Sequence, residues 1–362
     1  MKVLLLGDYS SLHKGLREGL LTFPDMQVDL FSNGDGWKKI GGATGTIPAR
    51  DINSIMDRFS LYFDQLKFCN GIGKYDVIQL INPFILSPVL NKYLYKCLLK
   101  RAKCVSLVAC GGDYRLAESY LNGCFKYAPE DYDGKWLAAY DRNSFRGRMN
   151  IDNEVWLEKH VNVIVPTLYE YSVGYKGQNV SDAIPFPINV DLISYSENII
   201  HEKVVFFHGL NNEAKKGTPF IRNAMERLVN DYPDDVEIII KGHMPYDEYV
   251  QVMRRANVVI DQCLTSAYGI NGCIAMAQGK VLMAGNTEDF RRTMKVDDCP
   301  IVHIEPDSEQ IYSQMVKLVK EKDKIQALGK KSREFAEKNH DYKKVAERYL
   351  DVWRCAGMTD DK

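Results

Sequence analysis

The sequence has no long hydrophobic run and no cysteines spaced to hold a metal. No stretch reaches the about 18 apolar residues of a membrane-spanning helix. The apolar run between Lys2 and Asp8 is also too short for a signal peptide. The nine cysteines are scattered and lack CxxC spacing, which favours reduced thiols over disulfides or a zinc site. We therefore expect a cytoplasmic protein, either soluble or attached peripherally to the inner face of a membrane.

The sequence also has almost no net charge. Its 47 basic and 48 acidic residues give a formal net charge of -1. A chain this close to neutrality has no global field to hold a nucleic acid, so we expect no nucleic-acid partner. Its hydrophobic and charged contents, 45% and 26%, are those of ordinary globular proteins. At 362 residues the chain exceeds what one core usually supports, which favours two domains.

Short apolar runs alternate with helical patterns along the whole chain. Several runs are apolar on both faces, as strands buried in a parallel sheet are. The runs span residues 2–7, 27–32, 76–81, 104–110, 162–167, 203–209, 236–242, 257–262, 280–285 and 300–305. Strand-helix alternation in both halves predicts two doubly wound α/β domains. Residues 114–156 depart from the alternation, and we interpret them as an insertion or a lid-like segment.

The helical pattern is clearest after residue 217, where Thr218 is a candidate N-cap and Pro219 suits the first turn. Farther back, prolines 185 and 187 and the polar stretch 194–203 indicate a domain boundary. We expect an N-terminal domain over 1–192 and a C-terminal domain over 193–340. We expect the remaining residues, 341–362, to form a helix that packs back toward the N-terminal domain.

Four segments in the second half carry a resemblance to a known family. They are "IPFPINVD" (184–191), "FFHGLNNEAKKGTPFIRNAMERL" (206–228), "GHMPYDEYVQVMRRANVVIDQC" (242–263) and "YGINGCIAMAQGKVLMAG" (268–285). Their order and intervals resemble those of the group 1, family 4-like glycosyltransferases of GT-B fold. The first half matches less well, through "LLLGDYSSLHKGLREGL" and "SLVACGGDYR". The resemblance implies two Rossmann-like domains that face each other across a cleft.

The same resemblance implies an activity. It implies transfer of a hexose from a nucleotide-sugar donor to a glycan or lipid-linked acceptor, in surface polysaccharide or glycoconjugate synthesis. It also implies retention of the anomeric configuration and no metal or other cofactor. In agreement, no DxD motif lies beside a predicted strand end.

The donor site that the resemblance implies lies mostly in the C-terminal domain. A glycine turn that feeds a helix offers unpaired N–H groups and a positive dipole end to a diphosphate. Lys216, on an open cleft, would pair with that diphosphate and act in catalysis, with Lys215 and Lys241 as rival cations. The implied donor-binding residues are Gly15, His208, Gly209, Asn211, Lys216, Gly217, His243, Ser266, Tyr268, Gly269, Ile270 and Asn271.

The chain departs from the family pattern at three positions. Ser266 and Ile274 stand where two family glutamates are usual, and Leu210 stands where an arginine is usual. Two other assignments have purely structural alternatives. His208 could be a hydrogen-bonded histidine of the core, and Gly15 could belong to an ordinary helix start.

On the acceptor side, the resemblance points to two aspartates. Asp113, in "ACGGDYR", would contact the acceptor or act as a base, and Asp35 would contact the acceptor. The alternatives are a helix cap for Asp113 and a simple turn residue for Asp35.

A basic stripe indicates a further partner. Lys92, Lys96, Lys100 and Lys103 recur at helical spacing opposite an apolar face, which is typical of a helix on an anionic membrane surface. The alternative is a solvated helix face.

Two other functions compete with a glycosyltransferase. A sugar-nucleotide epimerase of similar two-domain fold needs carboxylates that face the sugar, and the missing glutamates count against it. A non-catalytic glycosyltransferase-like subunit, bound to a partner enzyme, is favoured by those same missing residues. Binding of nucleoside diphosphates, measured by thermal shift, separates a catalytic protein from such a subunit.

Overall fold

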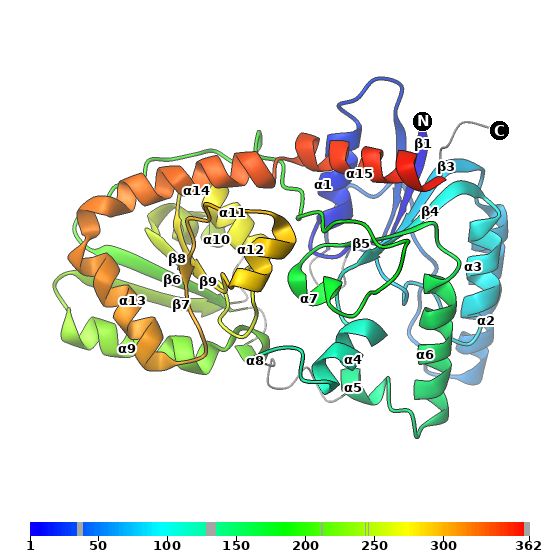
Figure 1. The fold of residues 1–362 in the computed structure, drawn as a ribbon, viewed down its shortest axis with the longest axis horizontal. Helices are drawn as coiled ribbons and strands as arrows, with labels where there is room; N and C mark the ends of the chain where they lie inside the picture. Colours follow the sequence, from blue (N-terminus) through cyan, green and yellow to red (C-terminus); the bar gives the residue numbers. More distant parts are fainter. Residues whose placement is uncertain (35–38, 128–134, 211–212, 243, 245, 358–362) are drawn as a thin grey trace. The chain divides into compact units, whose positions relative to one another are not determined.

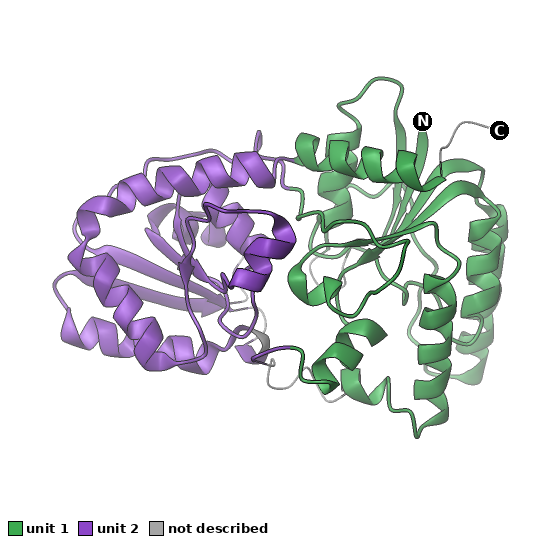
Figure 2. Cartoon of the chain, in the orientation of Figure 1, with its two compact units in different colours: residues 1–124, 134–187, 342–362 green, residues 125–133, 188–341 purple. Residues whose placement is uncertain are grey.

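The structure is a computed structural model, and it describes residues 1–34, 39–127, 135–210, 213–242, 244 and 246–357. Asp35, Asn211 and His243, predicted above as site residues, lie outside the described residues. The chain forms two compact units (Figures 1 and 2). Unit 1 comprises residues 1–124, 134–187 and 342–362, and unit 2 comprises residues 125–133 and 188–341.

Unit 1 is built on a parallel sheet of five strands in the order β2-β1-β3-β4-β5. The strands are β1 (Lys2–Leu6), β2 (Gln27–Phe31), β3 (Tyr75–Leu80), β4 (Ala102–Ala109) and β5 (Val163–Pro166). Since β1 and β3 are buried on both faces, their apolar runs are continuous rather than alternating.

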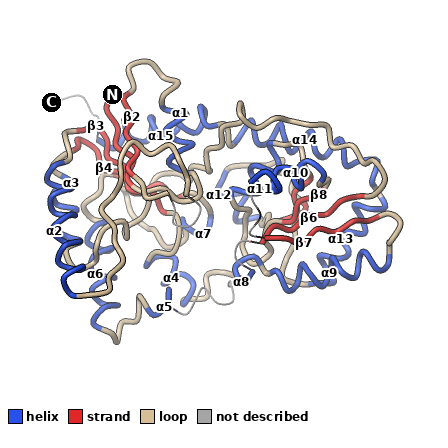
Figure 3. The backbone as a smooth tube through the Cα atoms, turned by 180° about the vertical axis from the view of Figure 1, so that it is seen from behind, coloured by secondary structure: helices blue, strands red, loops and turns tan. Residues whose placement is uncertain are grey.

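Helices cover both faces of this sheet. They are α1 (Leu12–Leu20), α2 (Ile55–Gly71), α3 (Asn91–Leu99), α4 (Tyr114–Leu121), α5 (Lys135–Ala138), α6 (Phe145–Glu158), α7 (Tyr169–Ser172) and α15 (Tyr342–Gly357). The connection from β1 to β2 runs opposite to those from β2 to β3 and from β3 to β4. Right-handed crossovers therefore place α1 on one face and α2 and α3 on the other. Helix α15 packs against α1, and α6 packs beside α3 (Figures 1 and 3).

Unit 2 repeats this plan with strands in the order β10-β9-β8-β6-β7, all parallel. Its strands are β6 (Val204–Leu210), β7 (Val236–Gly242), β8 (Val258–Ile260), β9 (Val281–Ala284) and β10 (Val302–His303). Its helices are α8 (Glu213–Lys216), α9 (Thr218–Asp231), α10 (Tyr246–Arg255), α11 (Ile270–Ala277), α12 (Glu288–Met294), α13 (Ser308–Lys320) and α14 (Ile325–Asn339), with a 3-10 turn at Lys322–Lys324. The two sheets confirm the prediction of two doubly wound α/β domains.

Helix α9 has the predicted apolar face but a different cap. Ile221, Ala224, Met225 and Leu228 are buried. The N-cap residue is Gly217, not Thr218 as predicted, and the Thr218 hydroxyl pairs with the ring of His208. Gly217 has a φ of +71°, and a Cβ there would meet the Cys263 sulfur at 2.4 Å. Glycine at 217 therefore permits both the turn and its close contact with Cys263, which follows strand β8.

The chain passes from unit 1 to unit 2 at Pro187 and returns at Tyr342. The polar stretch 194–203 lies in unit 2, where Asn198 Nδ2 donates to the Asn257 carbonyl at 2.8 Å. Helix α15 belongs to unit 1, and Trp353 Nε1 donates to Gln79 Oε1 at 3.1 Å. That hydrogen bond holds the helix against the centre of the sheet.

Among the described residues, no helix combines the length and apolar character that crossing a bilayer requires.

Candidate functional site

A buried ion pair lies at the carboxyl ends of strands β6 and β8 in unit 2. Lys216 ends α8, and its Nζ lies 2.9 Å from Oδ1 of Asp261, the residue directly after β8. The other oxygen, Oδ2, accepts the Gly269 N–H at 2.7 Å. Since Gly269 is the N-cap of α11, Asp261 ties the lysine loop to the glycine turn.

The two charges are held out of water, because Lys216 and Asp261 are both buried. Burial acts to raise the pKa of Asp261, but the Lys216 ammonium and the Gly269 N–H outweigh it and hold the pKa below its ordinary value. The carboxylate is therefore ionised. The sequence predicts a lysine on an open cleft, and this is wrong: Lys216 is an interior cation that already has a counterion.

His208 lies beside this pair with both ring nitrogens occupied. Its Nδ1 lies 2.9 Å from the Ile260 carbonyl, and its Nε2 lies 2.8 Å from the Thr218 hydroxyl. Burial lowers the pKa of His208 to about 4, so the ring is neutral. Nδ1–H then donates to Ile260 and Nε2 accepts from Thr218. The ring fits the core-histidine alternative, and a direct contact with donor remains only a prediction.

The glycine turn before α11 does not present all of its backbone N–H groups to a ligand, which differs from the prediction. The Tyr268 ring is buried, and its hydroxyl lies 2.7 Å from His340 Nε2 inside unit 2. The Gly269 amide is used by Asp261. The first-turn N–H groups of Ile270 and Asn271 lack an intrahelical partner, as in any α-helix, and both residues are half-buried. These two amides are the best anion donors of the segment.

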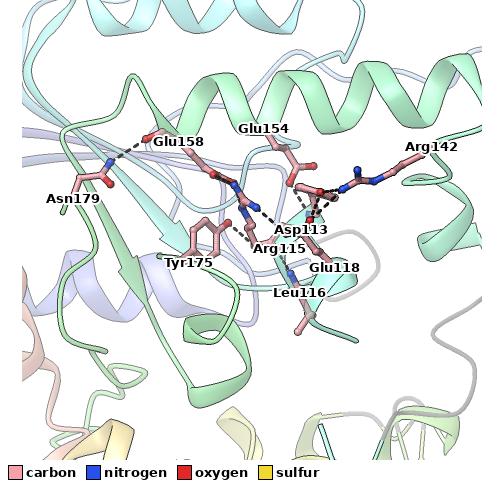
Figure 4. Close-up of polar contacts among 10 residues, drawn as sticks. Asp113, Arg115, Leu116, Glu118, Arg142, Glu154, Glu158, Tyr175 and Asn179 are labelled. Atoms are coloured by element: carbon pink, nitrogen blue, oxygen red, sulfur yellow. Dashed lines mark hydrogen bonds and ion pairs between the residues drawn. The ribbon is translucent and has the colours of Figure 1, made fainter. Parts of the chain in front are cut away.

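Asp113 forms a second buried centre, in unit 1 (Figure 4). It is the N-cap of α4: Oδ1 accepts the Leu116 N–H at 2.8 Å, and Oδ2 accepts the Tyr175 hydroxyl at 2.9 Å. Glu154 of α6 lies nearby and accepts the Tyr114 N–H at 2.7 Å and the Tyr140 hydroxyl at 2.8 Å. The sequence interpretation missed Glu154 entirely.

These two carboxyl groups hold protons more tightly than ordinary acids. Burial raises the pKa of Asp113 to about 6, against the hydrogen bonds it accepts. Burial, and then the charge of Asp113, raise the pKa of Glu154 well above its usual range. The pair therefore binds protons at pH values where ordinary carboxyl groups are ionised. In this arrangement Asp113 is a helix cap, which is the alternative given above. A contact with the acceptor substrate through Oδ2 would require the Tyr175 hydroxyl to move away.

An arginine closes the cluster on the outside (Figure 4). Arg115 donates to both oxygens of Glu158, at 2.8 and 2.7 Å, and to Glu118 at 2.8 Å. Three of its five N–H donors are thus committed to structure, so Arg115 is a poor candidate for ligand binding.

The other predicted positions are spread over both units. Gly15 lies in α1, where a Cβ would meet the Pro187 carbonyl oxygen at 2.6 Å, so glycine is needed for packing within unit 1. Gly209, in strand β6, and Ser266, before the glycine turn, are half-buried in unit 2. The structure thus brings Lys216, Gly217 and Gly269 together through Asp261. Asp261 was not predicted as a site residue. Its position directly after a buried strand was the sequence signal that could have indicated it.

No protein-family model and no curated protein matches the sequence. The structure, in contrast, is similar to many solved structures. One is sucrose-phosphate synthase from Thermosynechococcus elongatus, with 14% identity, a TM-score of 0.62 and coverage of 98% of this chain and 99% of that chain. Another is HepE from Anabaena, in complex with UDP-glucose, with 12% identity, a TM-score of 0.63 and coverage of 98% and 100%.

A structure described as that of a candidate UDP-N-acetylglucosamine 2-epimerase from Listeria monocytogenes gives a lower TM-score of 0.53 at 10% identity, with coverage of 99% and 97%. At these identities the comparisons bear on fold. They show that this chain, over nearly its whole length, has the two-domain α/β fold called GT-B.

Proposed function

We propose that the chain is a glycosyltransferase that moves a sugar from a nucleotide-sugar donor to a glycan or lipid-linked acceptor. The observation that carries the proposal is the link from Lys216 through Asp261 to Gly269 at the carboxyl ends of β6 and β8. Open parallel sheets bind their ligands at that edge. The link places a cation beside the N-terminus of α11, which is the combination a diphosphate needs.

In the proposed reaction the nucleoside diphosphate leaves as the sugar is transferred. Lys216 and the first-turn amides of Ile270 and Asn271 stabilise the negative charge that grows on the leaving phosphate. Asp261 positions Lys216. Its negative charge also offsets that of the lysine, which limits how tightly the product diphosphate is held. Retention of configuration, hexose transfer and independence of metal ions are parts of this proposal, supported by the resemblance and by the lack of a DxD motif beside a predicted strand end.

The first donors to test are uridine diphosphate sugars, because HepE binds UDP-glucose. A thermal-shift screen against uridine, guanosine, adenosine and thymidine diphosphates identifies the base. We expect one of them to raise the melting temperature. An absence of any shift would favour the non-catalytic subunit, which the residues Ser266, Ile274 and Leu210 support.

Lys216 is expected to contribute directly to nucleotide affinity. Lys216→Ala should weaken nucleoside diphosphate binding by about 1.5–3 kcal/mol, the range for a charge-assisted hydrogen bond. The measurement is titration calorimetry below the unfolding temperature of the variant. Lys241→Ala is the matched control, since Lys241 is an exposed lysine of unit 2 paired with Glu248. Weaker binding in the Lys241 variant alone would transfer the role to Lys241.

Ile274 offers a test of the departure from the family pattern. The residue is half-buried in α11, at the place where the family usually has a glutamate. Ile274→Glu should tighten nucleoside diphosphate binding by roughly 1.5–3 kcal/mol, because a carboxylate there accepts ribose hydroxyls. Ile274→Gln, which has the same size and no charge, is the control. A lower melting temperature with unchanged affinity in both variants would show that position 274 faces the core of unit 2 and not the donor.

The proposed location is the cytoplasm, with peripheral attachment at the inner membrane face through the lysines of and after α3. Lys92 and Lys103 are engaged in ion pairs with Asp152 at 3.6 Å and Asp76 at 3.2 Å. Lys96 and Lys100 are exposed. These two are therefore the lysines best placed to meet an anionic surface.

A further inference from the structure

Helix α2 turns an apolar face to solvent. Ile55, Met56, Phe59 and Phe63 are 67%, 70%, 63% and 67% exposed. Positions i, i+1, i+4 and i+8 lie on one side of a helix. The residues that α2 buries against unit 1 are on another side of the helix and include the polar Gln65. Helix α2 thus carries large apolar residues outward as well as inward, whereas a surface helix normally directs its apolar stripe inward and its polar residues outward.

The neighbouring helices also carry exposed apolar side chains. Helices α2, α3 and α6 lie side by side in one layer over the sheet of unit 1 (Figures 1 and 3). Three more large apolar side chains of this layer are exposed: Val89 just before α3, Tyr93 within it and Phe145 at the start of α6. Scattered single apolar residues are common on protein surfaces, but a run of this size marks an interaction site.

Basic residues outnumber acidic ones around the apolar surface. The exposed basic residues of the three helices are Arg58, Lys67, Lys96, Arg146 and Arg148, with Lys100 directly after α3. Of the acids on the same helices, Asp64, Asp152 and Glu158 form ion pairs with Arg50, Lys92 and Arg115, and Glu154 is buried. Asp57 accepts a hydrogen bond from the Ser54 hydroxyl and keeps its negative charge. The whole chain is almost neutral, so basic charge is concentrated on this layer.

The charge decides between two occupants of the apolar surface. A second copy of the chain would bring two basic surfaces together, which is unfavourable. An anionic lipid bilayer offers acyl chains to the apolar side chains and phosphates to the lysines and arginines. Aromatic side chains such as Phe59, Phe63 and Tyr93 are also favoured at the boundary between headgroups and acyl chains.

We propose that the outer face of α2 inserts into the surface of an anionic bilayer, with Lys96 and Lys100 against the lipid phosphates. A helix of this kind lies in the plane of the interface, with its apolar side buried about 5–10 Å. The inference deepens the proposed function, because a lipid-linked acceptor is met at such a surface. It rests on the exposed residues of unit 1 and not on the donor site.

The test is flotation of the purified chain with vesicles. One set contains phosphatidylcholine alone, and the other contains equal parts of phosphatidylcholine and phosphatidylglycerol. We expect binding to the anionic vesicles, and Phe59→Ser/Phe63→Ser should lower the partition coefficient by about tenfold or more. Leu192→Ser, at an exposed leucine of unit 2, is the matched control and should bind as the native chain does. An unchanged melting temperature shows that the variants are folded.

Lys96→Gln/Lys100→Gln should also reduce binding to the anionic vesicles, by about tenfold, and salt should weaken the binding of the native chain. The inference is overturned if the native chain does not float with anionic vesicles, or if the phenylalanine variant floats equally well. It is also overturned if light scattering finds a dimer that the phenylalanine variant abolishes, since a second copy then covers α2. Nucleotide binding is measured on the same samples. A chain that floats but binds no nucleoside diphosphate would refute the proposed function and leave this inference standing.

Discussion

Lys216→Ala is expected to lower the free energy of unfolding by about 3–5 kcal/mol, because it leaves a buried charge without its partner. The structure places Lys216 Nζ 2.9 Å from Asp261, and both side chains are buried. In the variant Asp261 retains only the Gly269 N–H as a described partner. The carboxylate must then take up a proton or draw in water, and either change destabilises unit 2.

The measurement is urea unfolding at neutral pH, followed by circular dichroism. Lys216→Met/Asp261→Leu is the informative second variant, because removal of both charges leaves no unpaired ion and should restore much of the lost stability. Lys241→Ala breaks an exposed ion pair with Glu248 and should change the unfolding free energy by less than about 1 kcal/mol. Equal effects of the two single variants would mean that Lys216 is solvated and the ion pair is not buried.

Glu154→Gln is expected to stabilise the chain at alkaline pH and to do so less as the pH falls. The pKa values of Asp113 and Glu154 are raised in the folded state, to about 6 for Asp113. Above the ordinary pKa of a carboxyl group, the folded chain therefore binds more protons than the unfolded chain. Stability then decreases as pH rises through the folded pKa values, by about 1.4 kcal/mol per pH unit for each extra proton.

The glutamine removes one of the two titrating groups and keeps its shape. Its oxygen can accept the Tyr114 N–H, and its Nε2 can donate to the Tyr140 hydroxyl, which lies 3.4 Å from the Gly112 carbonyl and can turn toward it. The difference in unfolding free energy between variant and native chain should grow from about pH 5 to about pH 8. Differential scanning calorimetry across this range measures it. A difference that does not change with pH would show that Glu154 is ionised throughout.

The sequence predicted the two sheets well because their strands are buried on both faces. Leu4, Leu5 and Leu6 of β1 are fully buried, and such continuous apolar runs are hard to mistake when helices separate them. Helix α6 was missed for the opposite reason. The face it buries carries Asn150, Asn153 and Glu154, each of which makes at least one hydrogen bond. A hydrophobic period cannot reveal a helix whose inner face is polar.

The candidate donor site was predicted in part. The motif order located Lys216 and Gly269, but neither periodicity nor spacing identified Asp261 as the residue between them. Asp261 lies 45 positions from Lys216, so their pairing exists only once β6 and β8 are adjacent. The same holds for Glu154, which lies 40 positions from the Tyr114 N–H that it accepts. Burial of an ion pair is a property of the folded sheet edge and not of either loop.

A donor screen with product detection by mass spectrometry tests the proposed activity most directly. The purified chain is incubated with uridine, guanosine, adenosine and thymidine diphosphate sugars, with lipid-linked and glycan acceptors, in the presence and absence of a chelator. We expect one donor to release its nucleoside diphosphate and yield a glycosylated acceptor, with and without the chelator. Lys216→Met/Asp261→Leu, which is expected to stay folded, should yield far less product. If no donor is consumed and no nucleoside diphosphate binds, the chain is not a nucleotide-sugar-dependent glycosyltransferase.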